Sequence, residues 1–249
     1  HEVNIKILLS QAMRNGNLPT GKRNGLLAQM TDDVAAHVLV HNYSQTGALT
    51  LAESTAARDH EANERLMVYL EKRSVLDRIV EGLPSTAEMR DRAEAKAWLT
   101  RPELAVLMAW SKITLFDDIT ASKVPDDPWF VETLKEYFPT DLEQFPDAMQ
   151  AHRLRREIIA TVLANRLIDA GGPLMLLRLR ERQIEAEHLL ADRARLDVAR
   201  SMAVEADGRW QSDRSRLGAV EGLLDRRADE RRVERRRALR CLRRQCGLR

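Results

Sequence analysis

The densest apolar stretch of the sequence runs from Leu104 to Phe116, and Lys112 is the only charged residue within it. At the helical repeat, apolar residues fall on nearly every side of this stretch: Leu104, Met108 and Leu115 share one side, and Val106, Trp110 and Ile113 share the other. A helix that is apolar on all sides must be enclosed, by other helices or by lipid. The stretch is too short to cross a bilayer. We therefore predict a buried central helix at about 103–116.

The residues before this stretch predict where its helix begins. Thr100 and Glu103 have the spacing of a capping box, and Pro102 falls in the first turn, where a missing N–H costs nothing.

The rest of the first 173 residues also shows helical spacing of apolar positions. The predicted helices are 3–14, 31–54 with an interruption at Gly47, 60–82, 85–97, 129–137 and 147–169. Gly171, Gly172 and Pro173 predict a firm helix end. No stretch alternates convincingly with the period of a strand, so the predicted fold class is all-α, an irregular multi-helix domain around the central helix.

Charge divides the chain near Pro173. Residues 1–173 hold 20 basic and 25 acidic residues, whereas residues 174–249 hold 20 basic and 13 acidic residues, and every basic residue of the second part is arginine. Phe, Tyr and Lys are all absent after residue 173. Because charge asymmetry of this kind indicates a boundary, we expect an arginine-rich tail at 174–249, helical or disordered, that does not pack into the domain.

Cysteine usage and the chain start bear on the context of the protein. Cys241 and Cys246 lie in the arginine-rich tail without a nearby histidine, which fits neither a zinc site nor a disulfide framework and suits a reducing compartment. The sequence shows no signal peptide and no transmembrane run, so we expect a cytoplasmic protein with no membrane partner. Since the chain begins with His1 instead of Met, we expect a fragment or a processed product.

Two motifs could carry chemistry, and neither is convincing. Residues 16–22, GNLPTGK, match most of a phosphate-binding loop, but Arg23 follows where Ser or Thr would hold Mg²⁺, and a helix precedes the motif where a strand is required. His37 and His41 are four residues apart and could chelate zinc, yet no third ligand is evident. A loop between helices and two ordinary histidines are the favoured interpretations.

A basic cluster stands at His152, Arg153, Arg155 and Arg156. Such a cluster repels itself unless it meets carboxylates or phosphates. Because residues 1–173 carry excess negative charge, we expect pairing within the protein or between subunits, and we consider nucleic acid an unlikely partner. The residues themselves therefore predict no catalytic, cofactor-binding or metal-binding site.

Seven segments in order resemble the large, bacterial-type NAD-specific glutamate dehydrogenases. They are HEVNIKILL (1–9), RNGLLAQMTDDVA (23–35), NYSQTGALTLAE (42–53), LTRPELAVLMAWSKI (99–113), VPDDPWF (124–130), EYFP (136–139) and HRLRREIIATVLAN (152–165).

The resemblance implies a division into three parts. Residues 1–15 would be the last helix of the catalytic domain, 16–173 a helical C-terminal domain, and 174–249 the arginine-rich tail. The NAD-binding domain and the catalytic residues would lie upstream of His1. The implied parent reaction converts L-glutamate, NAD⁺ and water to 2-oxoglutarate, ammonium and NADH. The expected role of this part is packing against the catalytic domain of the same polypeptide and assembly of a homo-oligomer, with no catalysis of its own.

The resemblance is expected to end at Pro173, and we hypothesise that a frameshift in a GC-rich gene produced the tail. An alternative interpretation is a free-standing helical interaction protein whose basic tail binds nucleic acid or anionic surfaces. Against it, acidic residues are interspersed among the arginines and no aromatic platform accompanies them.

Overall fold

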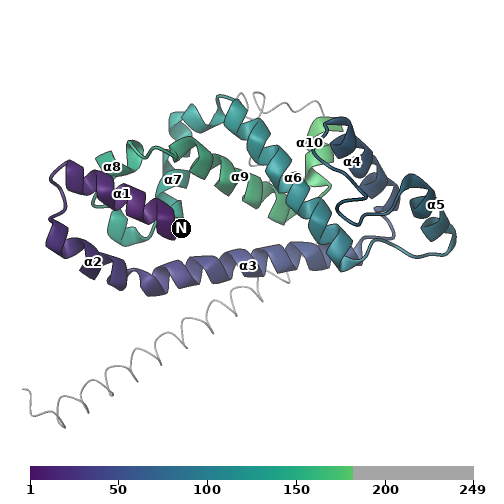
Figure 1. Cartoon of the computed structure of the whole chain (residues 1–249), viewed down its shortest axis with the longest axis horizontal. Helices are drawn as coiled ribbons and strands as arrows, with labels where there is room; N and C mark the ends of the chain where they lie inside the picture. Colours follow the sequence, from purple (N-terminus) through teal and green to yellow (C-terminus); the bar gives the residue numbers. More distant parts are fainter. Residues whose placement is uncertain (182–249) are drawn as a thin grey trace, which may run out of the picture. The chain divides into compact units, whose positions relative to one another are not determined.

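The structure is a computed structural model that describes residues 1–181, all of which fall within one unit of the chain (Figure 1). The described residues contain no strand, which confirms the all-α prediction. The helices are α1 (Glu2–Arg14), α2 (Thr20–Gln29), α3 (Thr31–Ser54), α4 (His60–Lys72), α5 (Thr86–Glu94), α6 (Arg101–Ala121), α7 (Val131–Tyr137), α8 (Pro146–Gln150), α9 (Arg155–Gly171) and α10 (Met175–Glu181). Three 3₁₀ turns complete them: η1 (Val124–Asp126), η2 (Pro128–Phe130) and η3 (Thr140–Leu142).

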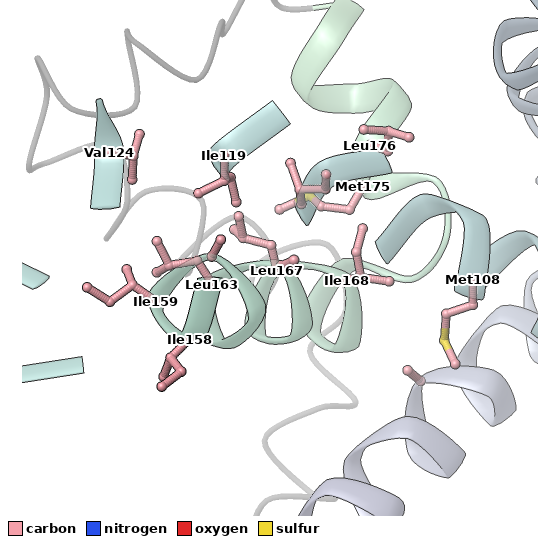
Figure 2. Packing of buried hydrophobic residues seen from close by; sticks show 14 of the residues in the cluster. Met108, Ile119, Val124, Ile158, Ile159, Leu163, Leu167, Ile168, Met175 and Leu176 are labelled. Carbon is pink, nitrogen blue, oxygen red and sulfur yellow. The ribbon is translucent and has the colours of Figure 1, made fainter. Parts of the chain in front are cut away.

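The core is built around the packing of α6 on α9, with α3 in contact with both. Figure 2 shows Leu163 and Leu167 of α9 beneath Ile119 of α6, with Met175 and Leu176 of α10 on the same side. Burying these aliphatic side chains is the main source of stability, at about 25 cal/mol for each Å² of apolar surface removed from water.

The start of α6 confirms its predicted capping box. The Glu103 carboxylate accepts hydrogen bonds from the backbone N–H and the hydroxyl of Thr100, at 2.7 and 2.8 Å, and it also pairs with Arg92. Ser85 and Glu88 form the same reciprocal arrangement at the start of α5.

The central helix is buried as predicted over much of its surface, but the prediction that it is enclosed on all sides is wrong at Ile113. One face of α6 is buried through Leu104, Leu107, Met108, Leu115 and Ile119. On the opposite face Val106 and Trp110 are half-buried and Ile113 is 46% exposed. In the described part of the chain α3, α9 and α10 contact α6, and Val106 and Trp110 pack against the edge of the core, whereas Ile113 is left uncovered.

Three predicted helices differ from the structure in continuity or in extent. Helix α3 continues through Gly47 without the expected interruption. The helix expected at 60–82 ends at Lys72, because Ser74 turns the chain with a positive φ of 58°. The helix expected at 147–169 is divided into α8 and α9, since the buried ring of His152 accepts a hydrogen bond from the Leu154 N–H and fixes a break between them.

The loop after α4 is held by one buried arginine. Arg78 donates hydrogen bonds to Glu64, Glu71 and the carbonyl of Pro84, and its side chain is only 6% exposed. The Asp77 carboxylate accepts hydrogen bonds from the backbone N–H groups of Ile79 and Val80. The side chains of both residues are highly exposed. The loop is therefore a rigid support for an apolar tip.

The expectation that the chain stops packing after Pro173 is wrong for residues 174–181. Helix α9 ends at Gly171 as predicted, and Gly172, with a φ of +69°, turns the chain back. Leu174, Met175 and Leu176 are buried, and the Ser111 hydroxyl donates a 3.0 Å hydrogen bond to the Pro173 carbonyl. Helix α10 thus belongs to the core. The rest of the predicted tail, including Cys241 and Cys246, lies outside the described residues.

Within residues 1–181, no single helix is long and apolar enough to cross a membrane. Helices α9 and α10 reach that length and composition only together, as a pair bent by 96°.

Candidate functional site: a histidine cluster beside a buried ion pair

Three histidines meet where the start of α1 lies against α3 and α7. The ring of His1 lies 5.4 Å from the ring of His37 and 5.3 Å from the ring of His41, between centroids. The same ring stacks on Tyr137 of α7 at 4.4 Å. The Tyr137 hydroxyl in turn accepts a 2.8 Å hydrogen bond from the side-chain amide of Asn4. The cluster therefore ties three helices together through aromatic contacts.

A largely buried ion pair lies close to this cluster. Lys112 Nζ of α6 is 2.6 Å from Asp169 Oδ1 of α9. Burial raises the pKa of Asp169, and the opposite charge of Lys112 works against that shift. Lys112, the one charge in the apolar stretch, thus has a specific partner across the helix pair.

His41 is influenced by both groups. Its side chain keeps a large exposed area, but the surrounding helices disfavour the charged ring, so burial lowers the pKa of His41. Asp169 opposes this shift, while His37 and Lys112 add to it. The geometry favours a neutral His41 at pH 7.

The predicted His37 and His41 pair gains a neighbour, but not a metal site. Within residues 1–181 no group of three His, Cys, Asp or Glu side chains is placed to hold a metal ion. Sequence reasoning missed His1 and Tyr137 because they are far from α3 in sequence, and no local spacing could have indicated their contact.

The GNLPTGK segment forms a connection between helices. Residues 15–18 turn the chain between α1 and α2, with Gly16 at a φ of +76°, and Thr20 already begins α2. Because the segment follows a helix, its surroundings differ from those of a phosphate-binding loop, which follows a strand. The interpretation as a helix connection is confirmed.

The basic cluster at 152–156 is partly neutralised inside the protein. Arg156 pairs with Asp126, and it donates 2.9 Å hydrogen bonds to the carbonyls of Thr120 and Ser122 at the C-terminal end of α6. His152 lies 3.1 Å from the carbonyl of Asn4, and burial lowers its pKa. The predicted pairing within the protein is thus confirmed for Arg156.

A family model for the catalytic domain of bacterial NAD-glutamate dehydrogenase matches residues 1–52, and a model for the C-terminal part of glutamate dehydrogenase matches residues 96–207. The chain belongs to the family of bacterial NAD-specific glutamate dehydrogenases. The second match continues past Pro173, where we expected the resemblance to end.

Curated relatives carry the same family name. The NAD-specific glutamate dehydrogenase of Pseudomonas aeruginosa is 46% identical over 182 residues, which cover 73% of this chain and 11% of the relative. The enzyme of Halomonas elongata is 41% identical over 208 residues, covering 83% of this chain and 12% of the relative. That of Mycobacterium tuberculosis is 35% identical over 240 residues, covering 84% and 15%. No solved structure matches the chain.

The chain therefore spans between a tenth and a sixth of the length of these relatives. The family name implies NAD, but residues 1–181 do not fit it, since a dinucleotide site needs a glycine-rich turn between a strand and a helix. The match to the catalytic-domain model runs to residue 52, and the boundary predicted at residue 15 stays a prediction.

Proposed function

We propose that this chain is the C-terminal part of an NAD-dependent glutamate dehydrogenase, and that this part serves domain packing and subunit assembly. The whole enzyme would convert L-glutamate, NAD⁺ and water to 2-oxoglutarate, ammonium and NADH in the cytoplasm. The observation that carries the proposal is the 46% identity to the Pseudomonas aeruginosa enzyme over most of this chain.

The geometry of the described residues supports a structural role. Four well-buried charged groups, Arg78, Glu103, Lys112 and Asp169, are engaged in ion pairs that join helices or brace a loop. Paired in this way, they fix the helices and the loop relative to one another. Exposed apolar side chains on α3 and α6 offer surfaces to other parts of the enzyme.

A chimera tests the proposal. Residues 1–181 of this chain replace the aligned residues of the Pseudomonas aeruginosa enzyme, and glutamate-dependent reduction of NAD⁺ is followed by absorbance. We expect the chimera to keep at least a tenth of the parent's kcat/KM, roughly 1.4 kcal/mol or less of lost transition-state stabilisation.

Two controls sharpen this experiment. A chimera that also carries Leu107→Asp should lose activity, because the helical core fails to form, whereas Ile79→Asp on the exposed loop should not. The 249-residue chain assayed alone should neither bind NAD⁺ in equilibrium dialysis nor reduce it. NAD⁺ reduction by the chain alone, or an inactive but folded chimera, contradicts the proposal.

A further inference from the structure

The outer side of α3 is an apolar surface that the described residues do not cover. Between Asp33 and Glu53 the helix carries no Asp, Glu, Lys or Arg. Its inner side packs through Ala48 and Ala52, which are buried. The opposite side is exposed at Ala36, Leu39, Val40, Tyr43 and Gly47, which we call the α3 stripe. A helix that is apolar on two sides requires a second partner.

The α3 stripe is continuous along the helix. Its members are three, one, three and four residues apart, so they follow one another along a single face. Leu39 is 52% exposed and Tyr43 is 46% exposed, which is a large cost for apolar groups in water. A Cβ added at Gly47 would meet no atom within 4 Å, so the space beside the helix there is open.

Apart from Leu39, which has Ser44 at the mirrored position, the pattern of sizes along the α3 stripe is the same in both directions. Two small residues, Ala36 and Gly47, flank the larger pair Val40 and Tyr43. If a second α3 is laid antiparallel about a two-fold axis midway between residues 41 and 42, Val40 of one copy faces Tyr43 of the other. Ala36 then faces Gly47, where small side chains allow the helices to approach closely.

Charges at the two ends of the α3 stripe complement each other in the same arrangement. Asp32 is exposed and stands seven residues before Leu39, on the same face. At the other end Arg101 is held on α3 by hydrogen bonds to Thr50 Oγ1, to Glu53 and to the Thr46 carbonyl, at 3.1, 3.0 and 3.2 Å. The two-fold arrangement brings Arg101 of each copy to the Asp32 end of the other.

We propose that the α3 stripe is a two-fold interface at which a second copy of this chain binds, with the two α3 helices antiparallel. This proposal rests on the proposed role in subunit assembly and names the surface and partner for it. Size and charge are both self-complementary about one axis, as an isologous interface requires.

Sedimentation velocity tests the proposal on the 249-residue chain. We expect a monomer–dimer equilibrium between roughly 1 and 100 µM, since a single helix seam is smaller than a standard interface of about 800 Å² per partner. Leu39→Arg should raise the dissociation constant at least tenfold and leave the thermal unfolding midpoint unchanged. Ile79→Arg is the matched control, because Ile79 is 93% exposed and lies away from the α3 stripe in sequence; it should leave the dimer intact.

Disulfide crosslinking tests the antiparallel register. Cys241 and Cys246 are first replaced by Ser, and Val40→Cys and Tyr43→Cys are made as separate chains. The antiparallel pairing predicts rapid crosslinking only when the two chains are mixed, whereas a parallel pairing would crosslink each chain with itself.

A chain that stays monomeric at 100 µM, or crosslinking within each single variant, overturns the proposal. If the monomer instead binds the catalytic domain of the Pseudomonas aeruginosa relative and Leu39→Arg prevents this, the α3 stripe contacts that domain and the two-fold interface is wrong, while the proposed function stands. An inactive chimera together with an intact dimer would contradict only the proposed function.

Discussion

Lys112 of α6 and Asp169 of α9 join the two central helices through an ion pair with 2.6 Å between Nζ and Oδ1, and each side chain is only 15% exposed. The pair stands at the end of an otherwise apolar stretch, so its charges are largely removed from water. A charge in that position is costly unless its partner is present. The pair therefore fixes the register of α6 on α9 more than it adds net stability.

Removing one partner of this pair should destabilise the protein strongly. We expect Lys112→Met to lower the free energy of unfolding by about 3 kcal/mol, because it leaves the Asp169 carboxylate without its counter-charge. Urea denaturation at pH 7 measures the change. Adding Asp169→Leu should recover most of the loss, since a buried ion pair is often replaceable by apolar residues of similar size.

The exposed pair Lys135 and Glu132 is the matched control for this prediction. Its side chains are 45% and 67% exposed, so Lys135→Met should change stability by less than about 1 kcal/mol. Equal losses for Lys112→Met and Lys135→Met would show that the α6–α9 pair has no special role.

The two faces of α6 should differ sharply in their tolerance of charge. Leu107 is fully buried, and Leu107→Asp would place an unpaired carboxylate in the core at a cost of several kcal/mol, enough to unfold the domain. Ile113→Asp on the exposed face should change stability by about 0.5 kcal/mol or less. Circular dichroism with thermal melting compares the two variants. Intact cooperative melting of Leu107→Asp would contradict the assignment of this face to the core.

Stability should decline as the pH falls below about 6.5, in part through His152. Burial lowers the pKa of His152, so the unfolded chain binds a proton more readily than the folded protein does. Its contribution is therefore complete above the unfolded pKa of about 6.5 and is lost as the pH falls below that value. The structural reason is that His152 Nδ1 accepts a hydrogen bond from the Leu154 N–H, which a protonated nitrogen cannot do.

Urea denaturation at pH 7.5 and 5.5 checks this dependence. We expect His152→Gln to be less stable than the parent at pH 7.5 and to lose less stability between the two pH values. His41, whose pKa burial also lowers, remains in both proteins, so the difference between them isolates His152. An identical pH dependence would mean that His152 does not change its protonation on folding in this range.

Local signals in the sequence predicted some of the helix starts and stops. The capping box at Thr100 and the turn at Gly172 depend on residues within four positions of one another, and each is present in the structure. The enclosure of α6 could not be predicted in this way, because it depends on which helices reach Val106, Trp110 and Ile113 from elsewhere.

The candidate site shows the same limit. The His37 and His41 spacing is visible in the sequence, but the rings that meet it come from His1 and Tyr137. The break at His152 also depends on a distant group, the carbonyl of Asn4. Composition was misleading after Pro173, because an arginine-rich average concealed the apolar run from Leu174 to Leu177 that the core takes up.

Helix α10 should behave as part of the core, whereas the change in composition at Pro173 predicts that the domain ends before this helix. Leu176 is 2% exposed, and we expect Leu176→Ala to lower the free energy of unfolding by about 2–4 kcal/mol through lost burial and a residual cavity. Glu181→Ala, on an exposed side chain of the same helix, should have an effect within about 0.5 kcal/mol. Urea denaturation measures both, and hydrogen exchange should show the amides of 178–181 protected together with those of α9. The opposite result would be an unchanged free energy of unfolding for Leu176→Ala together with rapid hydrogen exchange of the amides of 178–181. It would place the end of the domain at Pro173 and favour a tail that does not pack.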